Sequence, residues 1–281
     1  EIVVVAPIKG GPSQKAGIQA EDIIIKVDDQ ELAKNDLESA VKLMRGEEKA
    51  GTEVKVTIKR VVDSEEKILD FTLKREEITT ESVSSKLLDN GILYIQITNF
   101  AEKTGEDFEK AVDEGLKKGA KSLIIDLRNN PGGLVTAVKQ VADKILPDAT
   151  IMKVVDSKGH ETIEKASGSG LDMPIIVLIN KGSASASEVL SVALHDNKKA
   201  QLLGEKSFGK GIIQSIFPIN NEGKAEGIKI TIAEYFGPNG TKINKVGLEP
   251  DHKVEQKNYS KIGIEHLDID PQLQKAIELL K

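Results

Sequence analysis

Three serines stand at alternating positions in a stretch of small residues, and a lysine follows them along the chain. The stretch "GSASASE" covers residues 182–188, and Lys210 lies in "KSFGKGIIQ", 23 positions after Ser187. A serine hydroxyl attacks poorly unless a base removes its proton, and a lysine made neutral by burial can be that base. These residue types would allow nucleophilic catalysis, and two other chemical uses of them are possible.

The first alternative is a phosphate-binding loop. Gly204 to Lys210 spells G-x-x-x-x-G-K, but position 211 is Gly, where such loops place Ser or Thr to hold magnesium. The loop should also open a helix, whereas the β-branched "GIIQSIF" that follows predicts a strand. Both departures argue against a nucleotide site.

The second alternative is a Ser-His-Asp triad that uses His195 and Asp196. If residues 185–195 form one helix, its ten-residue rise spans about 15 Å. An imidazole at the far end could not reach a hydroxyl near the helix start. We therefore expect His195 to lie at a helix end or on the surface.

The third reading is a Ser–Lys pair. Lys210 has apolar or glycine neighbours, and Gln214 lies four residues later, where its side chain could hold the amine by a hydrogen bond. A helix start behind the serines would point backbone N–H groups at developing negative charge. Ordinary roles stay open at this point, because Ser and Ala are common at helix starts and most lysines are solvated.

The first part of the chain, residues 1–77, reads as a strand-rich unit. Alternating apolar residues predict strands, and an apolar stripe at helical spacing predicts one amphipathic helix capped by Asn35 or Asp36. The polar stretch 74–82 is the best boundary. The expected elements are a strand at 2–5, a helical turn at 11–18 closed by Gly17, a strand and tight turn in 22–32, the helix at 35–45, and strands at 53–60 and 69–73.

The second part, residues 78–281, changes to continuous apolar strands separated by helices. A strand is expected at 92–97, and strands at 122–127 and 174–180 are short and largely apolar, as strands buried on both faces are. A helix opened by Thr104, with Asp107 three residues later, resembles a capping box. This β-loop-α order places ligands at the strand carboxyl ends. Further strands are expected at 211–219 and 228–236, and a helix at 271–280.

Composition excludes several functions. The net charge of −6 and the well-mixed 30% of charged residues leave no basic footprint for nucleic acid or an anionic membrane. There is no cysteine, so disulfides and a thiol nucleophile are excluded. No apolar run reaches the roughly 18 residues needed to span a bilayer. Because Glu1 is no initiator methionine, we expect a fragment or mature form whose targeting segment lies outside this sequence.

Three motifs resemble those of the carboxyl-terminal processing proteases, peptidase family S41. "NKGSASASEVLSVALHDN" with "LLGEKSFGKGIIQS" resembles their active-site stretch, "IIDLRNNPGG" their second signature, and "GPSQKAGIQAEDIIIKVDD" the PDZ domain before the core. The resemblance covers about residues 2–255. It implies an α/β protein: a strand-rich PDZ domain with two helices at 1–77, lacking its N-terminal part, and a crotonase-like S41 core at 78–281 with a mostly parallel buried sheet.

The resemblance also assigns roles by position. Ser185 would be the nucleophile, Lys210 the general base, and Gln214 the residue that orients the base. The backbone N–H groups of Gly133 and Ala186 would form the oxyanion hole. Packing or capping roles would then fall to the two remaining serines, Ser183 and Ser187.

The implied function is serine endopeptidase cleavage of proteins near their C-termini through an acyl-enzyme, with the PDZ domain recognising substrate or regulating the enzyme. The resemblance implies no metal or organic cofactor and an extracytoplasmic location. The expected partners are proteins or peptides with C-terminal tails, and no nucleic acid; a homo-oligomer is left open, and membrane attachment would need segments absent from this sequence. Two alternatives remain: an inactive or regulated S41-like peptide-binding protein, and an acyl-CoA enzyme on the same core topology.

The PDZ resemblance departs from its family at the start of the chain. PDZ domains hold a terminal carboxylate with a loop before the first strand of the pocket and add the peptide beside that strand. The segment 2–5 would be roughly that strand, so we expect the loop to precede Glu1. Val41 and Met44 are expected to line the peptide pocket. Arg45 could read the carboxylate, and an exposed helix-end arginine is the ordinary alternative.

Overall fold

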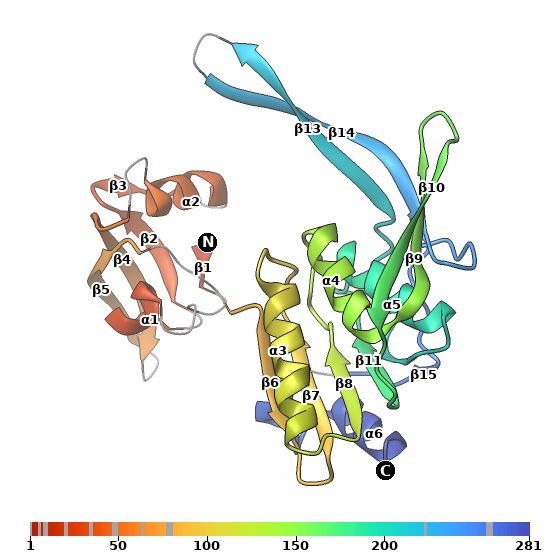
Figure 1. The fold of residues 1–281 in the computed structure, drawn as a ribbon. Helices are drawn as coiled ribbons and strands as arrows, with labels where there is room; N and C mark the ends of the chain where they lie inside the picture. The colour runs from red at the N-terminus through yellow and green to blue at the C-terminus, as the bar shows by residue number, and fades with distance from the viewer. Residues whose placement is uncertain are drawn as a thin grey trace. The chain divides into compact units, whose positions relative to one another are not determined.

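A computed structural model describes residues 2–4, 7, 11–19, 22–33, 36–46, 50–62, 65–76, 81–221, 224–256 and 261–281. The chain divides into two compact units, Glu1–Thr80 and Glu81–Lys281, coloured red to orange and yellow to blue in Figure 1. The boundary predicted between residues 77 and 78 lies outside the described residues. No helix among the described residues is long and apolar enough to cross a membrane.

The first unit is an antiparallel sheet with two short helices among its described residues. The strand order is β1-β2-β4-β5, and β3 pairs with β2. Its core holds Ile18, Val27, Val54, Val56, Ile58 and Leu73. The elements are β1 (Ile2–Val3), α1 (Pro12–Ala16), β2 (Ile23–Val27), β3 (Gln30–Glu31), α2 (Leu37–Arg45), β4 (Glu53–Val62) and β5 (Glu65–Lys74).

Local sequence signals explain both helices of this unit. Helix α1 ends at Gly17, whose φ of +96° suits a residue without a side chain. Asp36 caps α2 by accepting a hydrogen bond of 3.0 Å from the Ser39 amide, as predicted; Asn35 lies outside the described residues. At the other end of α2, Arg75 donates to the Leu43 and Met44 carbonyls. Both ends of the helix are therefore satisfied by side chains.

The main sheet of the second unit is mostly parallel, which confirms the predicted fold class. Its order is β15-β12-β11-β8-β7-β6, and among the described strands only β6 runs antiparallel to its neighbour. Every residue of the central strands β8 and β11 is buried. The strands are β6 (Val83–Leu87), β7 (Ile92–Ile97), β8 (Ser122–Asp126), β11 (Ile175–Ile179), β12 (Gln201–Gly204) and β15 (His252–Lys253).

Helices cover both faces of this sheet (Figure 1). Alternate strand residues such as Ile125 and Val177 pack in the cluster that holds α3, α4 and α5. Their neighbours, such as Ile124 and Ile176, pack against α6. The helices are α3 (Thr104–Lys117), α4 (Val135–Ile145), α5 (Ala186–Asp196) and α6 (Pro271–Leu279), with a 3-10 turn at Ile264–His266.

The capping box predicted at the start of α3 is wrong. Lys103 occupies the N-cap position, and its side chain makes no capping hydrogen bond. The hydroxyl of Thr104 instead accepts a 2.8 Å bond from the Ala101 amide and lies 2.6 Å from the Ser82 hydroxyl. The Thr104 hydroxyl therefore bonds to buried groups that precede the helix, and it does not cap the free N–H groups of the first turn.

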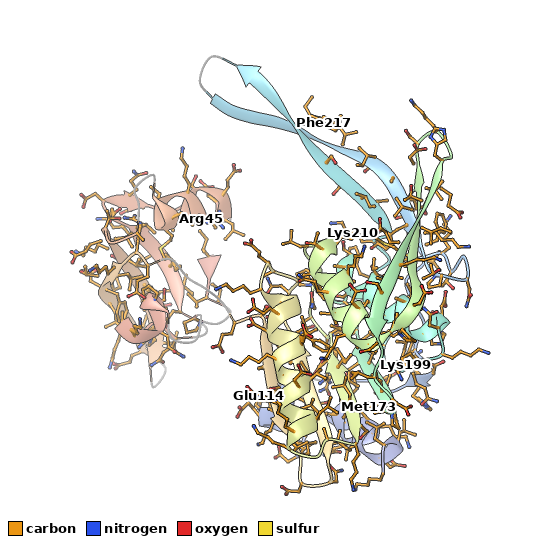
Figure 2. The ribbon with its side chains drawn as sticks, in the orientation of Figure 1. Arg45, Glu114, Met173, Lys199, Lys210 and Phe217 are labelled. Carbon is orange, nitrogen blue, oxygen red and sulfur yellow. The ribbon has the colours of Figure 1, made fainter. Side chains whose placement is uncertain are left out.

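A second, antiparallel sheet has the order β10-β9-β14-β13. It consists of β9 (Pro147–Asp156), β10 (Glu161–Ser169), β13 (Ile212–Asn221) and β14 (Lys224–Phe236). The sequence predicted β13 and β14 but not β9 and β10. The long β13–β14 hairpin extends away from the helices, with Lys210 at its base and Phe217 farther out (Figure 2).

Candidate active site

Two loops meet where the central parallel strands end. The loop after β8 contains Asn129, and the loop after β11 begins at Asn180. The Asn129 amide donates to the Asn180 side-chain oxygen at 2.9 Å, and the Asn180 side-chain nitrogen donates back to Asn129 at 2.8 Å. This reciprocal pair fixes the "LRNNPGG" loop against the serine segment at the strand carboxyl ends, where the sequence predicted a site.

Two of the three serines are bound into this loop junction. The Ser183 hydroxyl donates to the Leu127 carbonyl at 2.8 Å and accepts from the Asn180 amide at 3.0 Å. The Ser187 hydroxyl donates to the Asn130 carbonyl at 2.9 Å. Both serines are fully buried. Their hydroxyls have structural partners, in line with the packing roles expected for them.

Ser185 differs from its neighbours in backbone and exposure. It is the N-cap of α5 with φ +55° and ψ −117°, and it is only partly buried. A non-glycine residue at such positive φ costs about 1–3 kcal/mol and is often found at functional sites. Gly132 packs closely against this turn. A Cβ at position 132 would lie 2.7 Å from the Ala184 carbonyl oxygen and 2.8 Å from the Ser185 Cβ. The glycine allows the two loops to approach this closely.

The two expected oxyanion donors, Gly133 and Ala186, line the same cavity as this serine. Gly133 has φ +148°, and its neighbours are tied to Phe100: the Phe100 amide donates to Gly132 at 2.9 Å, and the Leu134 amide donates to Phe100 at 2.8 Å. Ala186 is the first residue of α5, so its N–H has no partner within the helix. The Gly133 segment is therefore held by backbone hydrogen bonds, and α5 leaves the Ala186 N–H available to a substrate oxygen.

The predicted residues surround one cavity of about 190 Å³. Lys210, between β12 and β13, reaches it from the base of the hairpin (Figure 2), and Gln214 lies on β13 itself. Lys210 and Gln214 are both partly buried. The lining contains all five residues expected to act in catalysis, which are Gly133, Ser185, Ala186, Lys210 and Gln214.

Sequence reasoning missed a buried carboxylate beside this cavity. Glu188 is fully buried and accepts hydrogen bonds from the amides of Ser185, Gly209 and Lys210 and from the Ser207 hydroxyl. The signal that could have found it is the spacing S-x-x-E at 185–188, which is that of a capping box.

A buried tyrosine was missed as well. Tyr235 on β14 lines the cavity and donates its hydroxyl hydrogen bond to the Lys210 carbonyl. Burial and the nearby charge of Glu188 raise the pKa of Tyr235, and a hydrogen bond with the Ser185 side chain opposes them only partly. The phenol therefore stays protonated at neutral pH. Nothing in "IAEYFG" signals this contact.

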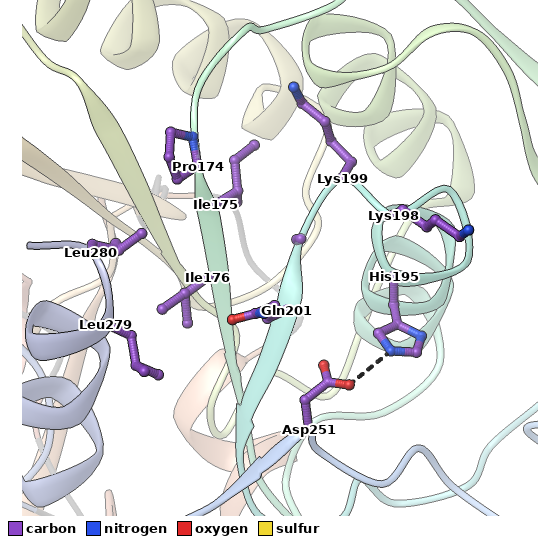
Figure 3. A pocket seen from close by; sticks show the side chains of 11 residues that line it. Pro174, Ile175, Ile176, His195, Lys198, Lys199, Gln201, Asp251, Leu279 and Leu280 are labelled. Carbon is purple, nitrogen blue, oxygen red and sulfur yellow. Dashed lines mark hydrogen bonds and ion pairs between the residues drawn. The ribbon is translucent and has the colours of Figure 1, made fainter.

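The histidine alternative is separated from the serine by the whole of α5. His195 lies near the end of that helix, and its Nε2 is 3.1 Å from an Asp251 carboxylate oxygen (Figure 3). Both line a different cavity of about 420 Å³, together with residues such as Leu279. The segment after Lys210 is the strand β13 and not a helix, so the phosphate-loop reading also lacks its structural context.

The residues expected to bind peptide lie on α2 of the first unit. Val41 and Arg45 are exposed, whereas Met44 is partly buried and packs against the core of that unit. Leu37, one turn before Val41, is also exposed, so the helix presents two apolar side chains to solvent. Peptide binding by this helix remains a prediction.

Sequence comparisons identify both units. The model of the PDZ domain matches residues 1–74, and that of peptidase family S41 matches residues 91–254. The chain belongs to peptidase family S41. This S41 protein is 38% identical over 272 residues to carboxy-terminal processing protease CtpA of Bacillus subtilis, covering 96% of this chain and 56% of that protein. It is 36% identical over 285 residues to a carboxyl-terminal-processing protease of Synechocystis, covering 100% of this chain and 65% of that protein.

Solved structures agree with this assignment. A photosystem II D1 C-terminal processing protease is 32% identical with a TM-score of 0.60, and the match covers 90% of this S41 chain and 68% of that protein. A putative S41 protease from Bacteroides fragilis shares the fold with a TM-score of 0.66 at 14% identity, over 99% of this chain and 77% of that one. The chain spans 56% and 65% of the lengths of the two curated relatives above.

Proposed function

We propose that this S41 protein is a serine endopeptidase that cleaves protein substrates near their C-termini, with Ser185 as nucleophile and Lys210 as general base. One observation carries the proposal: Ser185, Lys210 and Gln214 line a single cavity with the two expected oxyanion donors. The names of its relatives, which are C-terminal processing proteases, support the same activity and substrate class.

The mechanism follows from the residues around the cavity. The amine of Lys210 takes the hydroxyl proton of Ser185 as the serine oxygen attacks the scissile carbonyl carbon. The N–H groups of Gly133 and Ala186 donate to the oxygen that becomes negative, and the N-terminus of α5 favours that charge. The ammonium of Lys210 then gives its proton to the leaving amine, and an acyl-enzyme remains on Ser185. A water molecule, deprotonated by Lys210, then releases the acyl group. Gln214 holds the Lys210 amine in place through these steps.

The PDZ unit adds a second part to the proposal. PDZ domains bind C-terminal peptides by strand addition, and Val41, Met44 and Arg45 of α2 are our candidates for contacts with substrate. Recognition of C-terminal tails there would deliver the adjoining segment for cleavage. The extracytoplasmic location that the resemblance implied belongs to this proposal too.

Cleavage of an unstructured protein tests the activity. The whole chain is incubated with casein and with a 20-residue apolar-tailed peptide bearing a free carboxylate or an amide at its C-terminus, and the products are mapped by mass spectrometry. We expect cuts near the free C-terminus, none with Ser185→Ala, and no effect of a chelator. Casein that stays bound but uncut by the wild type would favour the peptide-binding alternative, and normal cleavage by Ser185→Ala would exclude the proposed nucleophile.

A further inference from the structure

We propose that Glu188 is a positioning residue that holds the nucleophile and the general base at a fixed separation. This inference rests on the proposed roles of Ser185 and Lys210. Glu188 lies in the first turn of α5, and its carboxylate reaches from the serine turn to the loop that carries the lysine.

One carboxylate oxygen joins the backbones of both catalytic residues. Oε2 of Glu188 accepts from the Ser185 amide at 2.9 Å and from the Lys210 amide at 2.8 Å. The two segments lie 25 positions apart in the sequence, and this atom is a direct link between them. A shift of Oε2 would move both backbones relative to each other.

The second oxygen extends the link along the lysine loop. Oε1 of Glu188 accepts from the Ser207 hydroxyl at 2.5 Å and from the Gly209 amide at 2.7 Å. The Ser207 hydroxyl in turn accepts from the Leu248 amide at 2.7 Å. On the other side of the lysine, Tyr235 donates to the Lys210 carbonyl. The N–H and the C=O of Lys210 are therefore both held.

Only a carboxylate satisfies this arrangement. An ionised carboxylate only accepts hydrogen bonds, through two oxygens. Among the described residues that of Glu188 accepts from four donors, and three of these are backbone N–H groups, which can donate but cannot accept. A glutamine would turn an NH2 group toward at least one of these N–H groups. Burying the charge is costly unless it is hydrogen-bonded, and four donors together with the N-terminal end of α5 offset that cost.

The link predicts an effect on the chemical step more than on binding. Glu188 is fully buried and is not among the residues that line the cavity, so we expect it to act without touching the substrate. A misplacement on the order of 1 Å between reacting groups can cost about 100-fold in rate. Loss of the link should therefore lower kcat and leave KM near its wild-type value.

The test compares Glu188→Gln with a matched variant, Glu205→Gln, in the full chain. Glu205 is also buried and accepts from a backbone amide, that of Gln256, and this bond is not one of the four that join Glu188 to the two catalytic loops. The rate of p-nitrophenol release from p-nitrophenyl acetate is measured, with Ser185→Ala as the blank, and circular dichroism gives the folded fraction. We expect Glu188→Gln to lose about 100-fold in kcat per folded molecule, and Glu205→Gln to keep wild-type kcat per folded molecule.

A second variant covers the case in which Glu188→Gln does not fold. Glu188→Asp keeps the charge but is one methylene shorter, so it cannot reach all four donors, and we expect a smaller loss of kcat with KM unchanged. Wild-type kcat per folded molecule in Glu188→Asp, or in a folded Glu188→Gln, would overturn the proposal. So would an equal loss of kcat in Glu205→Gln.

A third variant separates this inference from the proposed function. If Lys210→Ala abolishes turnover while folded Glu188→Gln is normal, the dyad stands and the positioning role fails. If Lys210→Ala turns over at the wild-type rate, the dyad fails, and Glu188 has no base to position.

Discussion

At the residue scale, the three serines of "SASAS" are distinguished by what their hydroxyls contact. Ser185→Ala should abolish cleavage and leave the fold intact, because its side chain lies at the cavity.

Ser183→Ala should keep activity but lose about 1–3 kcal/mol of unfolding free energy, since the buried Asn180 amide loses its acceptor. Ser187→Ala loses one buried hydrogen bond, worth about 1 kcal/mol. Urea titration and casein cleavage of each variant measure these effects; an active Ser185→Ala beside an inactive Ser187→Ala would reverse the assignment.

The tyrosine beside the dyad gives a prediction for pH dependence. Burial and the charge of Glu188 raise the pKa of Tyr235 above its ordinary value of 10.0, so the neutral phenol persists through the range below that value. The pH–rate profile between about pH 7 and 10 should then have the same shape in wild type and Tyr235→Phe, although the variant turns over more slowly because the Lys210 carbonyl loses a donor. An alkaline limb that disappears in Tyr235→Phe would show that the phenol ionises.

The residues that the sequence revealed and those it concealed differ in a physical way. Ser185 and Lys210 stand out because small and glycine-rich neighbours are unusual around a hydroxyl and an amine. Glu188 looks like any helical glutamate, and its burial depends on a loop that arrives 19 to 22 positions later. Tyr235 reaches the dyad only because the β13–β14 pairing places it there. Long-range contacts of this kind leave no local pattern.

At the scale of elements, α6 is fastened to the sheet by a buried arginine. Arg128 donates to Asp126 at the end of β8 and to Asp270 and Gln272 at the start of α6. Arg128 directly precedes the loop that holds the oxyanion donor, so α6 supports that loop. Arg128→Met would leave the buried carboxylates of Asp126 and Asp270 without their cationic partner and should cost about 3–5 kcal/mol. Denaturant titration measures this loss, and a loss below about 1 kcal/mol would contradict the buried pairing.

The same cluster predicts how stability responds to acid. Burial acts to raise the pKa of Asp270, but hydrogen bonds and the charge of Arg128 outweigh it and hold the pKa below its ordinary value of 3.8. The stability from this carboxylate is therefore fully present above 3.8 and is lost as the pH falls through its lower folded-state pKa. In Asp270→Asn the unfolding free energy should be lower at pH 7 and fall less steeply below about pH 4. Parallel curves for the two proteins would contradict this role.

Helices and strands were predicted correctly where their sequences are apolar on one face or on both faces. The central strands and α2, α5 and α6 have continuous or helical apolar patterns, and most of their expected bounds agree with the structure. β9 and β10 have neither pattern, because much of their surface is exposed and their sequences, "PDATIMKVVD" and "ETIEKASGS", mix charged and small residues. Their pairing with each other and with β14 defines them, and pairing is not visible in a local window.

At the scale of the whole molecule, each unit has its own apolar core. The core of the first unit lies wholly within residues 1–80, and the clusters of the second unit lie wholly within 81–281. We therefore predict that residues 81–281 fold without the PDZ unit and show a cooperative thermal transition and wild-type p-nitrophenyl acetate hydrolysis. Loss of that transition on deletion of residues 1–80 would show that the two units fold as one.

Covalent labelling of the whole chain measures whether Lys210 activates Ser185. A fluorophosphonate reacts when a serine oxygen attacks phosphorus and fluoride leaves, and intact-mass and peptide mass spectrometry locate the adduct. We expect one adduct, on Ser185, with labelling strongly slowed in Lys210→Ala and also in Lys210→Arg, because arginine does not give up its proton. An adduct on Ser183 or Ser187, or labelling at the wild-type rate in both Lys210 variants, would contradict it.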